Sequence, residues 1–491
     1  MSEKSALVGL EPALVWERFA ELTRIARPSK EEEAARKHVL AWAAARDLDT
    51  SMDDEGNAVV RIPASPGRDD APTVVLQSHL DMVCERDPDS PYDPRQGRIN
   101  VVVDGDWVLA EGTTLGADNG IGVAAAMAVA DDPGIEHGPL ELLFTVSEEQ
   151  GLDGAKALDP ALVSGRLLLN LDGTSDDAVT VGCAGSAHTF VRVHLELEPH
   201  RPDHVALEVI LSGAKGGHSG GGIASGRVNA IRALGRILAR SFEQEPFRLA
   251  RLEGGVSRNA IPREARAVVS LEPDAEPAFR AAAEQELAAL REQYNGFDDE
   301  LVLSVERVAE IDAAGESATA LVLDLVAAIP TGVIAMSPEL LGTVETSTSV
   351  TVATTEGDAL TLASMTRSSN ARALEDAVAT IVAAARLAGA DVEIARSYPP
   401  WRPDLDSRLL ATARTTFARL FGVEPTLAVV HGGLECAVIG GKLPGVEMIS
   451  IGPEILGPHA PGERLSISGT QRFYRLLGAL LDDLSRQTEI R

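Results

Sequence analysis

Short apolar runs alternate with helical patterns over the first 185 residues, and this alternation limits the possible fold more than any other feature. The runs 57–64 and 72–83 have the pattern of strands, and the runs 140–151 and 166–173 have the pattern of buried strands that end in acidic residues. Helical patterns cover 29–48 and 116–132, and the first begins with Ser29 and Glu32 in the spacing of a capping box. Buried strands joined through helices predict a largely parallel sheet with both faces covered.

The sequence pattern changes near residue 186. Strand candidates with clearer alternation follow at 204–213, 247–255 and 264–273, and helical patterns follow at 225–241 and 276–294. After residue 395 the earlier pattern returns, with helices at 406–421 and 468–486 and strands at 426–431 and 446–451. We therefore predict an α/β domain with a mixed, mostly parallel sheet at 1–185 and 396–491, interrupted by an inserted α+β domain at 186–395.

The composition excludes several classes of function. Among 491 residues, Lys and Arg number 44 and Asp and Glu number 74, so the net charge is −30. Phosphates would be repelled, and we expect no nucleic-acid or membrane partner. The three cysteines are too few and too far apart for a cysteine-rich zinc finger or a disulfide scaffold. Since there is no apolar leader and no apolar run of roughly 18 residues, the cytoplasm is the expected compartment.

His, Asp and Glu residues follow the predicted strands at the points where the strands end. The motifs are SHLD at 78–81, GADNG at 116–120, SEEQG at 147–151, NLDG at 170–173 and GPH at 457–459. Because open α/β sheets bind ligands beyond the carboxyl ends of their strands, these side chains are candidates for one common site. A mixture of carboxylates and imidazoles suits catalytic zinc or a similar divalent ion.

The spacing within two of these motifs has a chemical reason. His79 and Asp81 point to the same side of a strand, so Asp81 can accept the second ring N–H of His79 and fix its tautomer. Glu148 and Glu149 diverge on an extended segment. One of them can therefore bind a metal ion while the other reaches the attacking water.

Each motif alone also has an ordinary explanation. A single His at a strand end is more often structural, adjacent Glu residues are usually solvated, and Asp before Asn-Gly is commonly a turn. Their joint occurrence in this order favours a site. Three carboxylates, from Asp118, Glu149 and Asp172, against two divalent ions would leave a small positive charge that acidifies a water molecule.

Two other functions fit part of the sequence. GHSGG at 217–221 matches the G-x-S-x-G nucleophile elbow, with Ser219 as nucleophile and His431 or His459 as base. A helix should follow that elbow, whereas further glycines follow here, and the acidic motifs would be unexplained. The same loop could bind an anion in a non-catalytic, metal-tuned binding protein, although the presence of Glu148 argues against that function.

Seven motifs resemble those of the aminoacyl-histidine dipeptidases (Xaa-His or beta-alanyl-histidine dipeptidases) of the di-zinc aminoacylase and carboxypeptidase superfamily. They are QSHLDMV, TTLGADNGIGVA, FTVSEEQG, NLDG, GGHSGG, RNAIPREA and GPHAPGERL. The resemblance covers nearly the whole chain. It implies a zinc-peptidase catalytic domain with an inserted lid domain, a small peptide substrate such as beta-alanyl-histidine, and two Zn²⁺ per chain. Mn²⁺ or Co²⁺ could use the same ligands.

The resemblance implies a role for each metal ligand. His79, Asp118 and Asp172 would bind one zinc ion. Asp118 would bridge to the second zinc ion, which Glu149 and His459 would complete.

The resemblance assigns two further carboxylates to the same centre. Asp81 would orient His79, and Glu148 would act as the general base and then as the general acid. The peptide bond between Asp118 and Asn119 is expected to be cis.

The resemblance also implies roles for residues outside the metal centre. His218 would stabilise the tetrahedral oxyanion. Asn259 and Arg367 would bind the carboxylate at the C-terminus of the substrate, for which the Arg fork is suited. Gly433, with Gly432, would line the substrate pocket by close backbone approach. The lid could also form a homodimer, which leaves open whether His218 acts in its own subunit or in a partner.

Overall fold

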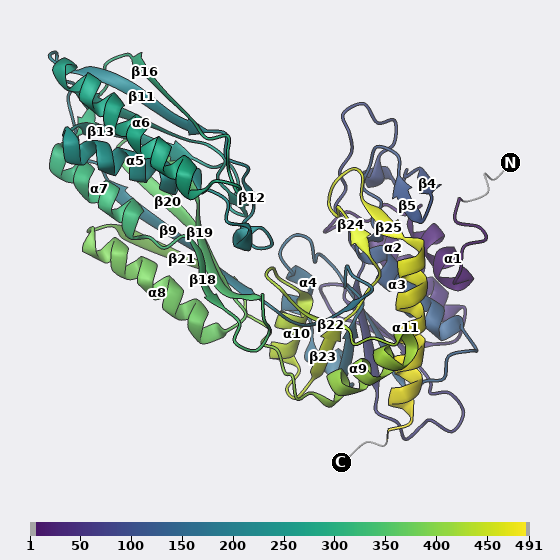
Figure 1. Ribbon diagram of the computed structural model, residues 1–491. Coiled ribbons are helices and arrows are strands. Elements are labelled where there is room, and N and C mark those ends of the chain that lie inside the picture. The colour runs from purple at the N-terminus through teal and green to yellow at the C-terminus, as the bar shows by residue number, and fades with distance from the viewer. Residues whose placement is uncertain (1–5, 488–491) are drawn as a thin grey trace. The chain divides into compact units, whose positions relative to one another are not determined.

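The computed structural model describes residues 6–487, which form two compact units (Figure 1). The first unit contains the residues up to Gly182, Pro403–Val429 and the residues from Leu434 onward. The second unit contains Cys183–Arg402 and Val430–Gly433. The first unit is therefore assembled from segments that precede and segments that follow most of the second unit in the sequence.

An eight-stranded mixed sheet forms the centre of the first unit, in the order β1-β2-β6-β3-β7-β23-β8-β22. Its four central strands run parallel and are β6 (Leu140–Thr145), β3 (Val74–His79), β7 (Leu167–Asn170) and β23 (Glu447–Ser450). Every residue of β3 and β6 is buried, as expected of strands covered on both faces. The carboxyl ends of these strands meet at one edge, which gathers the polar residues that follow them.

The remaining strands of the first unit extend this sheet or form a smaller one. The flanking strands of the large sheet are β1 (Asp49–Met52), β2 (Ala58–Ile62), β8 (Ala178–Cys183) and β22 (Thr426–Val430). A separate four-stranded sheet contains β24 (Ile455–Leu456), β25 (Arg464–Ser466), β5 (Trp107–Ala110) and β4 (Val101–Asp104). The loop between β24 and β25 carries His459.

Helices cover the large sheet of the first unit. They are α1 (Ala13–Leu22), α2 (Glu33–Ala44), α3 (Ala117–Asp131), α4 (Asp153–Ala157), α9 (Arg408–Phe421), α10 (Glu435–Lys442) and α11 (Ile467–Ser485). Helix α3 is rich in Ala and Gly and is buried along most of its length, between α1 and β3. Small side chains allow this close approach, which places the start of α3 against the end of β3.

The predicted capping box of Ser29 and Glu32 is wrong, because both side chains bind elsewhere. Ser29 Oγ donates to Asp81 Oδ2 at 2.7 Å, and Glu32 Oε1 accepts from the backbone N–H of Ser147 at 2.9 Å. Buried polar groups at the sheet edge need partners, and these contacts supply them in preference to a local helix cap.

A nine-stranded antiparallel sheet forms the second unit, in the order β16-β11-β15-β13-β19-β20-β9-β21, with β18 paired to β19. The strands are β9 (Gly185–His194), β11 (Val205–Ser212), β13 (Arg248–Gly254), β15 (Ala265–Leu271), β16 (Val302–Val308), β18 (Gly332–Met336), β19 (Val344–Glu356), β20 (Ala359–Ser368) and β21 (Asp391–Tyr398). Short pairs join β12 (Gly217–His218) to β14 (Ala260–Ile261) and β10 (Leu197–Glu198) to β17 (Ala313–Ala314). Four helices lie along one face of the large sheet (Figure 1): α5 (Ala230–Gln244), α6 (Glu276–Gln293), α7 (Glu316–Ala328) and α8 (Ala371–Leu387).

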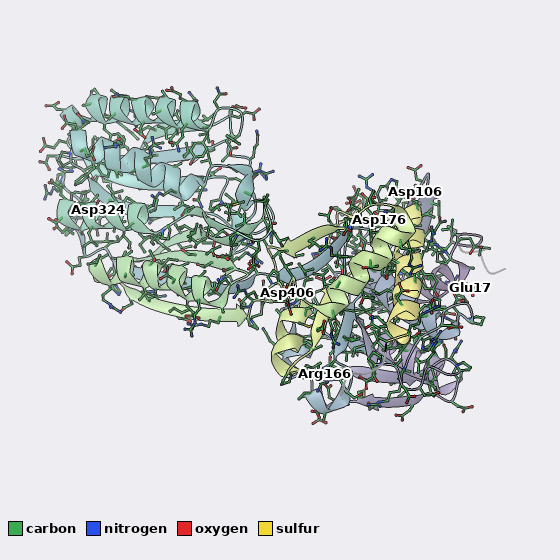
Figure 2. All side chains as sticks on the ribbon, turned by 60° about the horizontal axis from the view of Figure 1, so that its bottom comes forward. Glu17, Asp106, Arg166, Asp176, Asp324 and Asp406 are labelled. Atoms are coloured by element: carbon green, nitrogen blue, oxygen red, sulfur yellow. The ribbon has the colours of Figure 1, made fainter. Side chains whose placement is uncertain are left out.

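The structure confirms the predicted fold class, an α/β protein whose mixed sheet has a parallel centre. That the second unit acts as a lid stays a prediction. The acidic excess is carried partly by exposed side chains such as Glu17, Asp106 and Asp324 (Figure 2). None of the helices within residues 6–487 has the length and apolar composition needed to cross a lipid bilayer.

A chain of edge-to-face aromatic contacts lies in the core of the second unit. The ring centroids of Phe242 and Phe247 are 5.2 Å apart, and those of Phe247 and Phe279 are 5.4 Å apart. Phe279 comes from α6 and is fully buried. It therefore joins α6 to the core between helices and sheet.

We expect Phe279→Ala to lower the free energy of unfolding of the second unit by about 3–5 kcal/mol, because it leaves a cavity and removes a ring contact. Urea unfolding followed by circular dichroism measures this change. Phe297→Ala is the matched control, since that ring is 51% exposed and its loss should change the stability by less than about 0.5 kcal/mol. Equal effects of the two substitutions would contradict this description of the core.

Candidate metal centre

The five predicted metal ligands converge beyond the carboxyl ends of the central strands of the first unit. His79 ends β3, Glu149 follows β6 and Asp172 follows β7. Asp118 lies in the first turn of α3, and His459 lies between β24 and β25. The parallel strands thus bring together residues that are up to 380 positions apart in the chain.

The Asp118 carboxylate lies between the two histidines. Its Oδ1 is 3.1 Å from His79 Nε2, and its Oδ2 is 3.2 Å from His459 Nε2. Asp172 Oδ1 is 3.5 Å from His79 Nε2, and Glu149 Oε1 is 3.1 Å from His459 Nε2. Each imidazole therefore faces one oxygen of Asp118 and one further carboxylate.

The donor atoms form three groups, of which two share Asp118 and the third contains His79, Glu148 and Glu149. Of the two that share Asp118, one contains His79, Asp118 and Asp172, the other contains Asp118, Glu149 and His459, and within each group the ligand atoms lie within 4.8 Å of one another. Imidazole nitrogens mixed with carboxylate oxygens are the donors of catalytic zinc and similar divalent ions. The residues present therefore fit two cations with a shared carboxylate.

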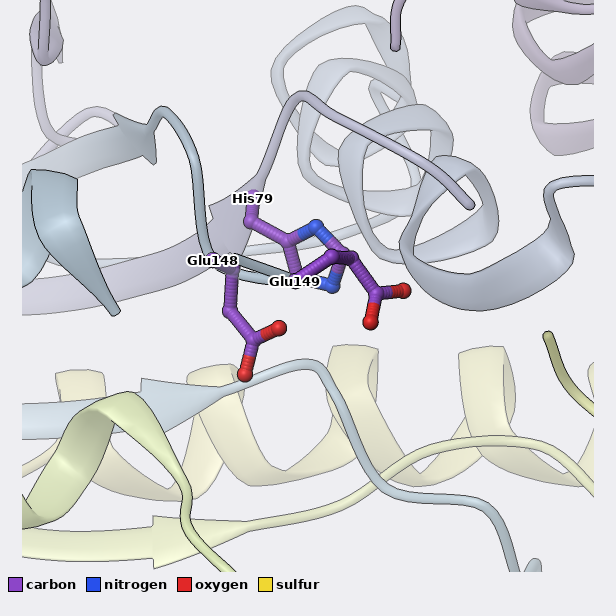
Figure 3. A group of neighbouring side chains, drawn as sticks. All are labelled: His79, Glu148 and Glu149. Atoms are coloured by element: carbon purple, nitrogen blue, oxygen red, sulfur yellow. The ribbon is translucent and has the colours of Figure 1, made fainter. Parts of the chain in front are cut away.

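Glu148 and Glu149 leave adjacent backbone positions in different directions beside the His79 imidazole (Figure 3). Glu149 reaches His459 at 3.1 Å. Glu148 has no such ion pair among the described residues, although one of its carboxylate oxygens lies within 4.8 Å of donor atoms of His79 and Glu149. The divergence expected from an extended segment is thus present, and Glu149 contacts His459 while Glu148 does not.

The Asp81 carboxylate contacts the His79 ring and the backbone of Glu148 and Glu149. Its Oδ1 is 3.2 Å from His79 Nδ1 and accepts the backbone N–H of Glu148 at 3.0 Å. Its Oδ2 accepts from Ser29 Oγ and from the backbone N–H of Glu149 at 3.1 Å. Burial opposes ionisation, but these hydrogen bonds, led by His79, lower the pKa of Asp81 to about 2. Asp81 therefore stays charged and orients both the His79 ring and the Glu148 turn.

The concentration of buried carboxylates perturbs the ionisation of the centre. Burial and the Asp118 carboxylate raise the pKa of Asp172 to about 8. Burial, with Asp172 and Glu149 nearby, also raises the pKa of Glu148 well above its usual value. Hydrogen bonds to Asp118 and Glu149 raise the pKa of His459 to about 11. The raised pKa values of Asp172, Glu148 and His459 reflect a buried excess of carboxylates, which favours a positively charged partner.

A polar cluster in the second unit contains two of the predicted substrate-binding residues. Arg367 donates to Asn259 Oδ1 at 3.3 Å and to the Tyr398 hydroxyl at 3.2 Å. The Tyr398 ring also packs on Gly433, where a Cβ would come within 2.6 Å of it. Arg367, Asn259 and Gly433 therefore meet around Tyr398, a residue that the sequence analysis missed because no motif marks it.

His218 lies on β12 and is exposed. Its Nδ1 accepts the backbone N–H groups of Gly220 and Gly221, each at 3.2 Å. A ring that accepts at Nδ1 carries its proton on Nε2 when neutral, so Nε2 has a hydrogen to donate.

The geometry around Ser219 does not favour a serine nucleophile. Ser219 is buried and precedes a short 3-10 turn at Ile223–Ser225, not the helix that a nucleophile elbow requires. His431 Nε2 is bonded to Ser347 Oγ at 2.7 Å. Burial and the nearby Arg367 lower the pKa of His431 to about 4, which makes this imidazole a weak base.

Comparison with known proteins identifies the family. The profile described as "Peptidase family M20/M25/M40" matches residues 75–483. The chain belongs to this peptidase family. This membership confirms the resemblance to a peptidase family that the sequence motifs indicated, and the prediction that the protein is a peptidase.

Two relatives match this M20 peptidase over almost its full length. The cytosol non-specific dipeptidase of Escherichia coli K12 is 36% identical over 98% of this chain and 99% of its own length. The crystal structure of aminoacylhistidine dipeptidase from Vibrio alginolyticus is also 36% identical, covers 98% of this chain and 99% of its own, and has a TM-score of 0.89. Aminopeptidase PepT from Bacillus cereus, at 18% identity and a TM-score of 0.57, shares the fold.

Several buried residues around the metal centre of this M20 peptidase were given no role from the sequence, although Glu463 lies within the motif GPHAPGERL. Glu435, at the start of α10, accepts from Gln77 Nε2 at 2.6 Å and from Thr145 Oγ1 at 2.7 Å. Burial raises the pKa of Glu435 to about 7. Arg27 and Glu463 contact the backbone next to the ligands. The expected cis peptide bond is present between Asp118 and Asn119.

We expect binding of Zn²⁺ at pH 7 to release protons, and the affinity to rise as the pH rises toward 8. The pKa of Asp172 is about 8 and that of His459 about 11 when no cation is bound, so both groups are protonated at pH 7 and a cation must displace those protons. Calorimetric titrations of the metal-free protein in buffers of different ionisation enthalpy count the protons released. Heats that do not depend on the buffer would contradict this assignment.

Proposed function

We propose that this M20 peptidase hydrolyses Xaa-His dipeptides, including beta-alanyl-histidine, at a centre that holds two divalent cations. We propose zinc as these cations. The observation that carries the proposal is the Asp118 carboxylate, which presents one oxygen to His79 and the other to His459. Such a shared carboxylate suits a pair of neighbouring cations.

The relatives support the substrate class. One is named a non-specific dipeptidase and the other an aminoacylhistidine dipeptidase, and each spans nearly all of this chain. The second name supports a preference for histidine as the C-terminal residue of the substrate. The first also supports the expected location in the cytoplasm, because that relative is named a cytosolic protein.

In this proposal His79, Asp118 and Asp172 would hold one cation, and Asp118, Glu149 and His459 would hold the other. Bound cations would lower the pKa of a water molecule and polarise the carbonyl of the scissile peptide bond.

Glu148 is the group that moves the proton. Its carboxylate lies beside the ligand cluster, and its pKa is raised by burial, which suits a group that must accept and then return a proton near neutral pH. Glu148 takes the proton of the attacking water and delivers it to the leaving amine. Asp81 holds Glu148 in place through the hydrogen bond to its backbone N–H.

The second unit supplies the groups that recognise the substrate. The Nε2–H of His218 stabilises the oxyanion, and Arg367 with Asn259 binds the substrate's carboxylate. Tyr398 and Gly433 line the same cluster. We further propose a homodimer that forms through the second unit.

We expect Glu148→Gln to keep its bound metal and to reduce kcat for beta-alanyl-histidine by about 10²–10⁴-fold, because the amide cannot accept the water proton. Amino-acid analysis of the products measures turnover, and elemental analysis measures the metal. The wild-type protein should lose activity with a chelator and regain it with Zn²⁺, while Ser219→Ala should remain active. Wild-type activity in Glu148→Gln would remove Glu148 from this role, and a fully active metal-free protein would overturn the proposed function.

We expect Arg367→Met to raise KM for beta-alanyl-histidine by about 10²-fold while leaving KM for the C-terminal amide of the same dipeptide nearly unchanged. The reason is that a charge-assisted contact to the carboxylate contributes about 1.5–3 kcal/mol, and the amide lacks that charge. Steady-state kinetics on the two substrates measure the difference. An equal loss on both substrates would show that Arg367 does not recognise the carboxylate.

A further inference from the structure

A buried carboxylate binds four consecutive backbone N–H groups at the turn that carries Asp118. Glu463 Oε2 accepts from Leu115 N at 2.8 Å and from Gly116 N at 2.9 Å. Glu463 Oε1 accepts from Ala117 N at 2.8 Å and from Asp118 N at 3.2 Å. The Glu463 side chain is 1% exposed, so these bonds are shielded from water. A charged acceptor makes each of them stronger than a neutral hydrogen bond.

A buried cation holds the opposite side of the same turn. The Arg27 guanidinium, 1% exposed, donates to Gly116 O at the turn and to Leu80 O and Asp81 O after β3. The backbone of the turn therefore has its N–H groups on an anion and a carbonyl on a cation. This pairing fixes the position of the turn relative to the end of β3.

The loop that carries His459 is attached to the turn through Glu463. His459 itself is half exposed and has a left-handed backbone conformation, with φ of 67°. Glu463 follows four residues later and is buried. Its bonds to residues 115–118 are therefore the buried connection between the backbone of the His459 loop and the backbone of Asp118.

We propose that Glu463 is a positioning residue that sets the distance between Asp118 and His459 and thereby controls the affinity of the cation site formed by Asp118, Glu149 and His459. The inference rests on the proposed function, because it refines how one of the two sites is built. His79 ends β3 and Asp172 follows β7, whereas the Glu463 carboxylate binds the backbone of residues 115–118. The other site should therefore be affected less.

The change Glu463→Gln tests this with the smallest change in shape. A glutamine has one carbonyl oxygen and one NH₂ group, so two of the four N–H donors would face another donor. The turn and the His459 loop would move apart to relieve this, which displaces Oδ2 of Asp118 from His459. Loss of an outer contact of this kind typically weakens metal binding about 10–100-fold.

The first unit provides a matched control in Glu141. This carboxylate is 2% exposed and accepts from Ser164 N, Ser164 Oγ and Gly165 N. Glu141 lies near the amino end of β6, whereas the metal centre lies beyond the carboxyl ends of the strands. Glu141→Gln removes the same kind of buried acceptor without contact to any ligand.

The experiment is a calorimetric titration of the full-length metal-free proteins with Zn²⁺, alongside their thermal unfolding. A His459→Ala variant identifies which binding step belongs to the Asp118, Glu149 and His459 site. We expect Glu463→Gln to weaken that step at least 10-fold and the other step less than 3-fold. Glu141→Gln should lower Tm and leave both steps within 2-fold of the wild type.

Three outcomes would overturn the inference: wild-type affinities in Glu463→Gln, an equal loss at both steps, or the same loss in Glu141→Gln. If Glu463→Gln does not fold, Glu463→Asp, which keeps the charge but shortens the reach, must show the same selective loss at a smaller size. The proposed function fails separately, in a wild-type protein that binds no Zn²⁺ or does not cleave dipeptides.

Discussion

The contact between the Asp118 carboxylate and two histidines from distant parts of the chain is the interaction on which the remaining structure depends. His79 and His459 approach opposite oxygens of this one side chain, so its position decides whether two ligand groups exist or only one. A carboxylate in this position must be held without using its own oxygens for support. Instead, the backbone around Asp118 is held in place, by hydrogen bonds to Glu463 on one side and to Arg27 on the other.

Bringing several carboxylates into a buried site is energetically unfavourable, because each loses hydration and repels the others. Burial and the neighbouring carboxylates accordingly raise the pKa values of Asp172 and Glu148. This cost is offset by neighbouring groups that hold the ligands in position but are not ligands themselves. Asp81 accepts from the backbone of the Glu148 turn, so the side chains that do chemistry remain available while their positions are set.

Sequence reasoning predicted that His79, Glu149 and Asp172 lie close together, and the structure brings them together because each lies at or shortly after the end of a buried strand and parallel strands end on a common side of the sheet. Their role as metal ligands stays a proposal. Sequence reasoning was wrong for Ser29 and Glu32, whose local spacing matched a helix cap although both bind residues far away in the chain. It gave no weight to Tyr398, Arg27 or Glu463. Arg27 and Glu463 contact backbone far away in the chain, and Tyr398 contacts Arg367 and Gly433, which no local spacing encodes.

The sequence by itself determined the class of fold and the kind of chemistry, since apolar periodicity fixes which segments are strands and the residues after them define a mixed carboxylate and imidazole donor set. The residue pattern did not decide how those donors are divided, which the family resemblance implied and the tertiary structure shows as geometry. The tertiary structure placed one oxygen of Asp118 on each histidine and put Glu463 on the turn that holds them. The physical reason is that hydrogen bonds between segments far apart in the sequence depend on packing in three dimensions, whereas strand and helix patterns depend on neighbours in the chain.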